Sequence, residues 1–260
     1  MGVINITPDS FSDGGDFYSV NNALLQAEKF IQAGADIIDL GAQSTRPGSI
    51  EVGPDEEISR LLPVLKELRN CFPEIIISVD TFHSIVAFKS LACGANWIND
   101  VTGGRRDNKI LDAVSEFNCP FVITHSRGNS QNMNSLTKYN NLVFDIIDAL
   151  NSLTDKAIKK NINRENIIWD PGLGFSKNTL QNIEILKNLK EFKKYSYPIL
   201  VGASRKRFIG EILNEDDPKK RDIGSLSVAA LCSQLKIEVI RVHNVQMHKE
   251  FLKVFREIND

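Results

Sequence analysis

Eight short apolar runs recur along the chain, and longer segments with helical periodicity separate most of them. The runs are hydrophobic without polar alternation, which is typical of parallel strands that are covered on both faces. We expect strands at residues 2–6, 35–40, 75–80, 96–100, 120–125, 166–170, 198–204 and 238–243.

The segments between the runs favour helices with one buried face. Leu142, Ile146 and Leu150 repeat at a spacing of one helical turn, which places them on a single stripe. Helices are predicted at residues 21–33, 55–70, 84–92, 142–160, 179–192, 222–235 and 245–258.

About eight strand–helix repeats in 260 residues, with no linker-like break, predict one domain over residues 1–260. The fold class is therefore α/β, and the economical architecture is a (β/α)8 TIM barrel. An open doubly wound sheet is the alternative, although it usually has fewer repeats. No GxGxxG follows the first strand, which counts against a dinucleotide-binding fold.

The charge balance and the distribution of cysteines set limits on the partners. A formal net charge of -2 gives no general attraction to nucleic acid or to an anionic membrane. No apolar run is long enough to span a bilayer, and no signal peptide is evident, so we expect a cytoplasmic protein. The four cysteines are scattered without a CxxC pair, which favours reduced core thiols over disulfides or zinc.

Every predicted strand ends in polar residues. A barrel that served only as a structural scaffold would not need them. In a barrel these carboxyl ends surround one mouth, where active sites are built. The polar residues at the strand ends are Asn5, Asp39, Asp80, Asn99, Asp100, His125, Asp170, Ser204, Arg241 and His243.

One sector of this mouth is neutral to acidic and contains Asp80, Asn99 and Asp170. Buried carboxylates need donors or cations as partners. A ligand with an amino-amidine edge, such as a pterin or a guanine, presents two parallel N–H groups that match a carboxylate. Helix capping is the alternative role for Asp80, a role that Thr81 or Ser84 would fill equally well.

The opposite sector is predicted to be cationic. Residues 205–207 follow a buried strand, and Arg241 and His243 share one face at the end of the last strand. Loops after the last two strands of a barrel commonly bind phosphate. Two alternatives stay open: Arg205 and Arg207 as a solvated helix face, and Lys206 as a Schiff-base lysine.

Two long polar loops, at residues 7–17 and 41–49, follow the first two strands and are candidate lids. Phe11 on such a loop would suit a flat aromatic substrate, although a disordered surface loop is the plainer interpretation. The histidines form no HxH or HExxH pattern. Magnesium held by Asn5 and a substrate diphosphate is reasonable, because Mg²⁺ uses few protein ligands.

Seven motifs, in order along the whole chain, resemble those of the dihydropteroate synthase family. They are NITPDSFSDGG (5–15), STRPG (44–48), SVDT (78–81), IND (98–100), DPGLGF (170–175), SRKRFIG (204–210) and RVHNV (241–245). The resemblance implies a (β/α)8 barrel that joins 6-hydroxymethyl-7,8-dihydropterin diphosphate to p-aminobenzoate in folate biosynthesis, and that sulfonamides target.

The resemblance also assigns roles to residues of this chain. It implies pterin contacts from Asp80, Asn99, Asp170 and Lys206. It implies diphosphate contacts from Asn5, Arg241 and His243, with Mg²⁺ near Asn5. It implies p-aminobenzoate contacts from Phe11, Thr45, Pro47, Phe175 and Ser204. The residues expected to carry catalysis are Lys206, Arg241, His243, Asp13 and Arg46.

Two positions depart from the usual family pattern. Family members often have a Met-containing sequence around the histidine of the fifth strand, where this chain has ITHSRG (123–128), so Thr124 is expected to alter the wall of the pterin slot. Gln43 stands where many members have Glu, and its role is open. A pterin-binding methyltransferase acting on methyltetrahydrofolate is the alternative activity, and a non-catalytic barrel or a sugar-phosphate aldolase is less favoured.

The family also implies a homodimer formed through outer helices, and in some members fusion to another folate-pathway enzyme. Family members normally carry residues before the first strand that cover the barrel floor. We therefore expect that this chain lacks an N-terminal segment or is cut from a longer polypeptide.

Overall fold

The computed structural model describes residues 1–6, 15–43 and 48–259. Its strands are parallel, and the first six form one sheet in chain order while the last two pair with each other. They are β1 Gly2–Asn5, β2 Ile37–Gly41, β3 Ile76–Asp80, β4 Trp97–Asp100, β5 Phe121–Thr124, β6 Ile167–Asp170, β7 Leu200–Val201 and β8 Val239–Ile240. All eight predicted strands are present, with shorter bounds.

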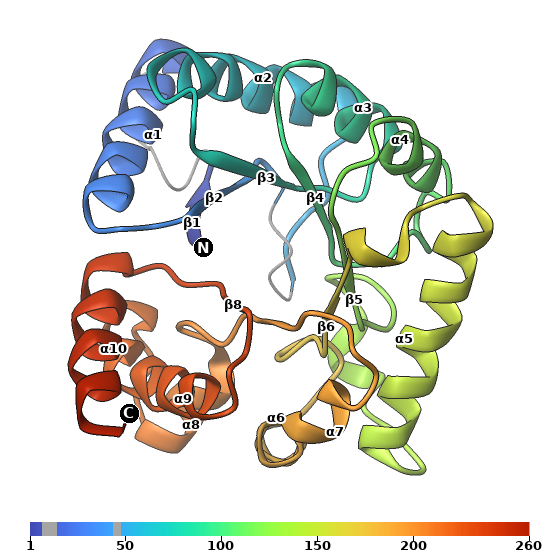
Figure 1. The fold of residues 1–260 in the computed structure, drawn as a ribbon, viewed down its shortest axis with the longest axis vertical. Coiled ribbons are helices and arrows are strands. Elements are labelled where there is room, and N and C mark those ends of the chain that lie inside the picture. The colour runs from blue at the N-terminus through green and yellow to red at the C-terminus, as the bar shows by residue number, and fades with distance from the viewer. Residues whose placement is uncertain (7–14, 44–47, 260) are drawn as a thin grey trace.

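Backbone contacts at two places join these strands into a ring. Trp169 bridges Ile199 between β6 and β7, and Gly2 bridges Val242 between β1 and the end of β8. At the second place Val3 N–H donates to the Val242 carbonyl at 3.0 Å. Figure 1 shows the helices arranged around the strands. The predicted (β/α)8 barrel is confirmed.

The helices follow the predicted segments with four differences, the first being that the first helix begins at Gly15 instead of at residue 21. They are α1 Gly15–Gln32, α2 Pro54–Cys71, α3 Ser84–Ala92, α4 Ile110–Glu116, α5 Leu142–Lys159, α6 Thr179–Lys187, α7 Leu189–Lys193, α8 Arg207–Leu213, α9 Asp222–Gln234 and α10 Val245–Asn259. The helices α4 and α8 were not predicted, because seven residues are too few to show a period. The predicted helix 179–192 divides at Asn188, whose side chain donates to the Glu184 carbonyl at 2.8 Å.

Alternation along the strands divides the core in two. Residues such as Ile38, Ile98 and Trp169 pack outward against the helices in the main cluster. Val122, Ile168 and Leu200 form a second cluster inside the barrel with Met1, Trp97 and Val239. The inward positions that follow toward the carboxyl ends are Asn5, Gly41, Asp80, Asn99, Thr124, Asp170, Gly202 and Arg241.

These eight inward residues, here called the inward layer, combine polar side chains with glycines. They lie above the apolar cluster inside the barrel. The barrel therefore presents polar residues of six strands to one interior space, and all of them except Thr124 were predicted as strand ends. Within the described residues, no helix has the length and apolar character needed to cross a membrane.

Candidate active site

Arg241 links the last strand to two carboxylates on β2 and β3. Its Nε lies 2.7 Å from Asp39 Oδ2, and its Nη2 lies 2.9 Å from Asp80 Oδ2. The Asp39 side chain is fully buried, and those of Asp80 and Arg241 are 9% and 19% exposed. The prediction that acidic and cationic sectors lie opposite each other is wrong, because the long arginine side chain spans the interior to reach both acids.

Asp39 organises this cluster, although it was not among the predicted site residues. Its Oδ1 accepts a hydrogen bond from the Ser78 hydroxyl at 2.6 Å, and its Oδ2 accepts one from Asn99 Nδ2 at 3.3 Å. Asp39 thus holds both Arg241 and Asn99. The polar end of the second strand was the available sequence signal, but nothing there distinguished Asp39 as the hub.

Asp80 faces the interior and does not cap a helix. The residue preceding α3 is His83, which makes no capping bond through its side chain, so the capping alternative is wrong. Burial raises the pKa of Asp80 to about 7, against the opposing effect of Arg241, and the nearby Asp39 adds to the rise. This carboxyl group can therefore exchange a proton near neutral pH.

Asp170 ends β6 and also points inward. Its Oδ1 accepts from the Gly172 N–H at 2.7 Å, which fixes the carboxylate at the start of the following turn. Burial raises the pKa of Asp170. Asp80, Asn99 and Asp170 thus converge from three strands, as the sequence predicted. Thr124 lies beside Asp170 in strand register and is buried.

Lys177 supports the turn after Asp170 and was missed by the sequence reasoning. Its buried Nζ lies 2.9 Å from His125 Nδ1, from the Gly172 carbonyl and from the Phe175 carbonyl. Three acceptors match the three N–H groups of an ammonium. Burial lowers the pKa of both Lys177 and His125. No sequence signal points to this role, because two of the acceptors are main-chain carbonyls.

The structure brings Phe175, Lys206, Ser204 and His243 to the β6–β8 side of the mouth in two contacting pairs. Lys206 Nζ lies 4.2 Å from the centroid of the Phe175 ring. Ser204 Oγ lies 3.1 Å from both the backbone nitrogen and Nδ1 of His243. The residues predicted for p-aminobenzoate and for diphosphate are therefore direct neighbours.

The other two cations of the SRKR motif are engaged away from the inward layer. Arg205 makes a two-pronged ion pair with Asp222, at 2.7 and 2.8 Å. Arg207 is exposed and pairs with Glu211 one turn along α8. The solvated-face alternative is thus confirmed for Arg207, whereas Arg205 ties the β7–α8 loop to α9.

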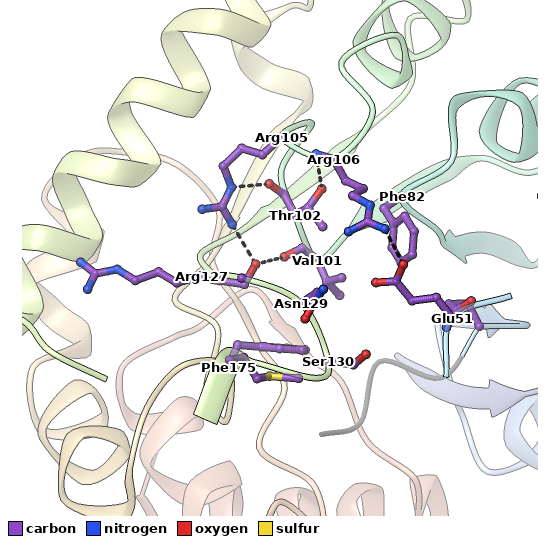
Figure 2. A pocket seen from close by; sticks show the side chains of 14 residues that line it. Glu51, Phe82, Val101, Thr102, Arg105, Arg106, Arg127, Asn129, Ser130 and Phe175 are labelled. Atoms are coloured by element: carbon purple, nitrogen blue, oxygen red, sulfur yellow. Dashed lines mark hydrogen bonds and ion pairs between the residues drawn. The ribbon is translucent and has the colours of Figure 1, made fainter. Parts of the chain in front are cut away.

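A cavity of about 230 Å³ opens between the loops that follow β2, β3, β4, β5 and β6 (Figure 2). Arg105 donates to the Thr102 carbonyl and to Ser126 Oγ, both at 2.8 Å. Arg106 pairs with Glu51. The lining residues are Gln43, Glu51, Phe82, Val101, Thr102, Arg105, Arg106, Ser126, Arg127, Gly128, Asn129, Ser130, Met133 and Phe175.

Five predicted site residues, namely Phe11, Asp13, Thr45, Arg46 and Pro47, lie outside the described residues. Gln43, adjacent to them, has a defined contact: its Oε1 accepts from the Val52 N–H at 2.7 Å, which ties the two ends of the β2–α2 loop.

Asn5 is the candidate magnesium ligand at the end of β1. Asn5 Oδ1 lies next to Gly41 on β2, where a built Cβ would be in ordinary contact with it at 3.8 Å. Among the described residues no three His, Cys, Asp or Glu side chains gather as a metal site. A single amide oxygen fits a cation that takes its other ligands from water and a substrate phosphate, as Mg²⁺ commonly does.

Comparison with known proteins shows the family to which the chain belongs. The pterin binding enzyme family model matches residues 1–243. A dihydropteroate synthase of Synechocystis is 41% identical over 98% of this chain and 88% of its own length. A solved dihydropteroate synthase of Clostridium difficile, obtained in the presence of pteroic acid, superposes with a TM-score of 0.93 at 38% identity, covering 99% of this chain and 95% of its own.

The chain belongs to the pterin-binding enzyme family, whose model it matches. Its barrel interior holds acids and amides beside an ion-paired arginine. Within that family the chain belongs with the dihydropteroate synthases. The folic acid synthesis protein fol1 of Pneumocystis carinii is 45% identical over 96% of this chain. The chain spans about a third (34%) of the length of that fungal protein.

Proposed function

We propose that this protein condenses 6-hydroxymethyl-7,8-dihydropterin diphosphate with p-aminobenzoate, giving 7,8-dihydropteroate and diphosphate. The observation that carries the proposal is the convergence of Asp80, Asn99 and Asp170 beside Arg241 in the barrel interior. Pteroic acid, in whose presence the Clostridium difficile structure was obtained, contains both halves of such a product, a pterin and a p-aminobenzoate.

The inward layer supplies what a pterin ring requires. Asp170 and Asp80 offer carboxylate oxygens to the amino-amidine edge, and Asn99 offers an amide that can donate and accept. These side chains are buried, so a ligand that satisfies them removes the cost of leaving them without partners. Lys206, close to the Phe175 ring, would complete the slot at its outer end.

Arg241, His243 and Asn5 would receive the diphosphate. Nε and Nη2 of Arg241 donate to Asp39 and Asp80, which orients the guanidinium, and Nη1 would donate to the diphosphate. His243 adds an imidazole held by Ser204. Mg²⁺ at Asn5 would supply further positive charge for the leaving group.

The chemical step needs help chiefly in the departure of diphosphate. An aryl amine is neutral at pH 7, so its nitrogen attacks without a strong base. Arg241 and His243 stabilise the charge that develops on the leaving oxygen, while the electron-rich pterin ring spreads the positive charge at the methylene carbon. Asp13 would stabilise that cation or accept the amine proton.

The p-aminobenzoate ring would lie outside the pterin, against Phe175 and Ser204. Phe11, Thr45, Arg46 and Pro47 are the predicted contacts from the first two loops, which would exclude water from the reactive carbon. Phe175 is held by Lys177 through its carbonyl, so the aromatic wall on this side is set in advance.

The assembly and cellular location are also proposals. We infer a cytoplasmic homodimer formed through outer helices, and a chain that in its natural context is fused to another folate-pathway enzyme. Three large apolar side chains exposed on α9 and α10, Ile223, Val254 and Ile258, support such an interface. Relatives in pea and Arabidopsis that are named folate synthesis bifunctional proteins support fusion.

The test is release of diphosphate from the pterin substrate in the presence of p-aminobenzoate, with product detected by chromatography. We expect diphosphate and dihydropteroate in equal amounts, and binding of p-aminobenzoate that depends on diphosphate. Binding of methyltetrahydrofolate with methyl transfer, and no diphosphate release, would instead support a pterin-binding methyltransferase.

A further inference from the structure

Asp222, the first residue of α9, binds the residue that follows Ser204 and the residue that follows His243. Its Oδ1 accepts from Arg205 Nε at 2.7 Å, and its Oδ2 accepts from Arg205 Nη2 at 2.8 Å and from Asn244 Nδ2 at 3.0 Å. Ser204 and His243 are themselves in contact, with Ser204 Oγ 3.1 Å from His243 Nδ1. The Asp222 carboxylate therefore joins the loops after β7 and β8 one residue beyond the point where Ser204 and His243 meet.

The main chain of Arg205 is held by the same segment as its side chain. Its N–H donates to Ser225 Oγ at 3.0 Å, and its carbonyl accepts from Arg221 Nη1 at 3.2 Å. Arg205 has a φ of 60°, in the left-handed region that residues other than glycine seldom adopt unless their surroundings hold them there. Residues 221–225 therefore fix the direction in which the chain leaves Ser204.

Asp222 is nearly buried and is ionised. Its side chain is 10% exposed, and that of Arg205 is 23% exposed. Burial raises the pKa of Asp222, but hydrogen bonds from Arg205 and Asn244 outweigh this effect and hold the pKa below the ordinary value. A two-pronged arginine–carboxylate pair combines charge with two parallel hydrogen bonds, which gives it a definite orientation. Asp222 is therefore a support of fixed geometry for both loops.

We propose that Asp222 is a positioning residue for the diphosphate, because it fixes the placement of Ser204 and His243 relative to each other. This rests on the proposed function, which gives His243 its contact with that group. Both oxygens of Asp222 accept hydrogen bonds from Arg205 and Asn244. Asp222 thus acts on the diphosphate through His243 and not by contact.

Asp222→Asn separates positioning from charge, because the two effects have opposite signs. Removal of a negative charge near an anion site favours the anion, so a purely electrostatic role predicts tighter binding of diphosphate. Removal of the two-pronged pair with Arg205 loosens the Ser204–His243 contact, so a positioning role predicts weaker binding.

The test is calorimetric titration of inorganic diphosphate, in the presence of Mg²⁺, into the wild-type chain and into Asp222→Asn. We expect the Kd for diphosphate to rise about tenfold in the variant. The Kd for 6-hydroxymethyl-7,8-dihydropterin, which has no diphosphate, should stay within about twofold, because Asp80, Asn99 and Asp170 on other strands would bind it. An unchanged pterin Kd also shows that the barrel of the variant is intact.

Asp216→Asn is the matched control. Asp216 is exposed, and it binds Arg221 Nη2 at 2.6 Å through its main-chain carbonyl, which the substitution keeps. The control loses the same charge as Asp222→Asn but no support of Arg205, so its Kd for diphosphate should not rise.

Arg205→Lys tests the same contact from its other side. Lysine keeps the positive charge but not the planar fork that matches a carboxylate, so the Kd for diphosphate should rise here too. An unchanged or lower diphosphate Kd in Asp222→Asn, or equal rises for diphosphate and pterin, overturns the proposal. A wild-type chain that does not bind diphosphate is a different result, which refutes the proposed function and, with it, this role for Asp222.

Discussion

The guanidinium of Arg241 lies 2.7 Å from the carboxylate of Asp39, across 202 residues of sequence. The pair joins β2 to the end of β8 inside the barrel, and the same guanidinium reaches Asp80 on β3. The site is therefore held together by a charge cluster that crosses the interior, in addition to the strand hydrogen bonds of the barrel.

Asp39→Asn should break this cluster with little change in shape. The amide keeps one acceptor for Ser78 but removes the charge that pairs with Arg241, which leaves a buried cation with weaker support. We expect the free energy of unfolding to fall by about 3 kcal/mol. Chemical denaturation measures the change. A variant as stable as the wild type would show that the pair contributes nothing net.

Arg241→Ala should slow turnover by about 100-fold, because it removes a donor to the departing diphosphate. It also leaves Asp39 and Asp80 without their cation, so stability must be measured in parallel. Arg241→Lys separates the effects, since it retains a charge but not the fork that reaches both acids. Turnover of Arg241→Ala at the wild-type rate would rule out the leaving-group role.

Asp80 should give opposite pH dependences for stability and for pterin binding. Its pKa of about 7 in the folded state exceeds the ordinary aspartate value of 3.8, so the folded state keeps the proton up to a higher pH than the unfolded state does. Its contribution to stability is full below about pH 4 and is lost as the pH rises to about 7, by at most about 1.4 kcal/mol per unit. Binding of an amino-amidine edge needs the carboxylate, so the KM for the pterin substrate should fall over the upper part of that range.

The Asp80→Asn variant isolates this group from its charged neighbours. Arg241, Asp39, Glu57 and Asp100 all act on Asp80, and burial raises the pKa of Asp100 to about 6. Whatever pH dependence remains in Asp80→Asn therefore belongs to the other groups. Identical pH profiles of the variant and the wild type would contradict the assignment.

Lys177→Met should destabilise the β6 turn. It leaves His125 Nδ1 and the carbonyls of Gly172 and Phe175 without their donor, at a total cost of about 3 kcal/mol. The melting temperature and the turnover rate should both fall. Lys190→Met, on the exposed surface of α7, is the control and should change neither, and equal melting temperatures for the two variants would argue against the role of Lys177.

The barrel could be predicted because buried parallel strands are apolar throughout. Much of the inward layer could be predicted because the strands end in polar residues, but β5 and β7 contribute Thr124 and Gly202 to it instead of the predicted His125 and Ser204. Asp80, Asn99 and Asp170 followed directly from that reasoning. The contacts of Arg241 with Asp39 and Asp80 did not, because the sequence does not show how far the Arg241 side chain reaches across the interior. Lys177 could not be predicted either, because two of its acceptors are main-chain carbonyls, for which residue type carries no signal.

The ion pairs of Arg241 with Asp39 and Asp80 also impose an order of events during synthesis. Arg241 is made 161 residues after Asp80, which takes about 8 to 32 s at ribosomal rates of roughly 5–20 residues per second. Until then both acids have to remain hydrated or protonated, because their cation does not yet exist. The charge balance of the interior is thus completed only when β8 and the Arg241 that follows it dock against the other strands.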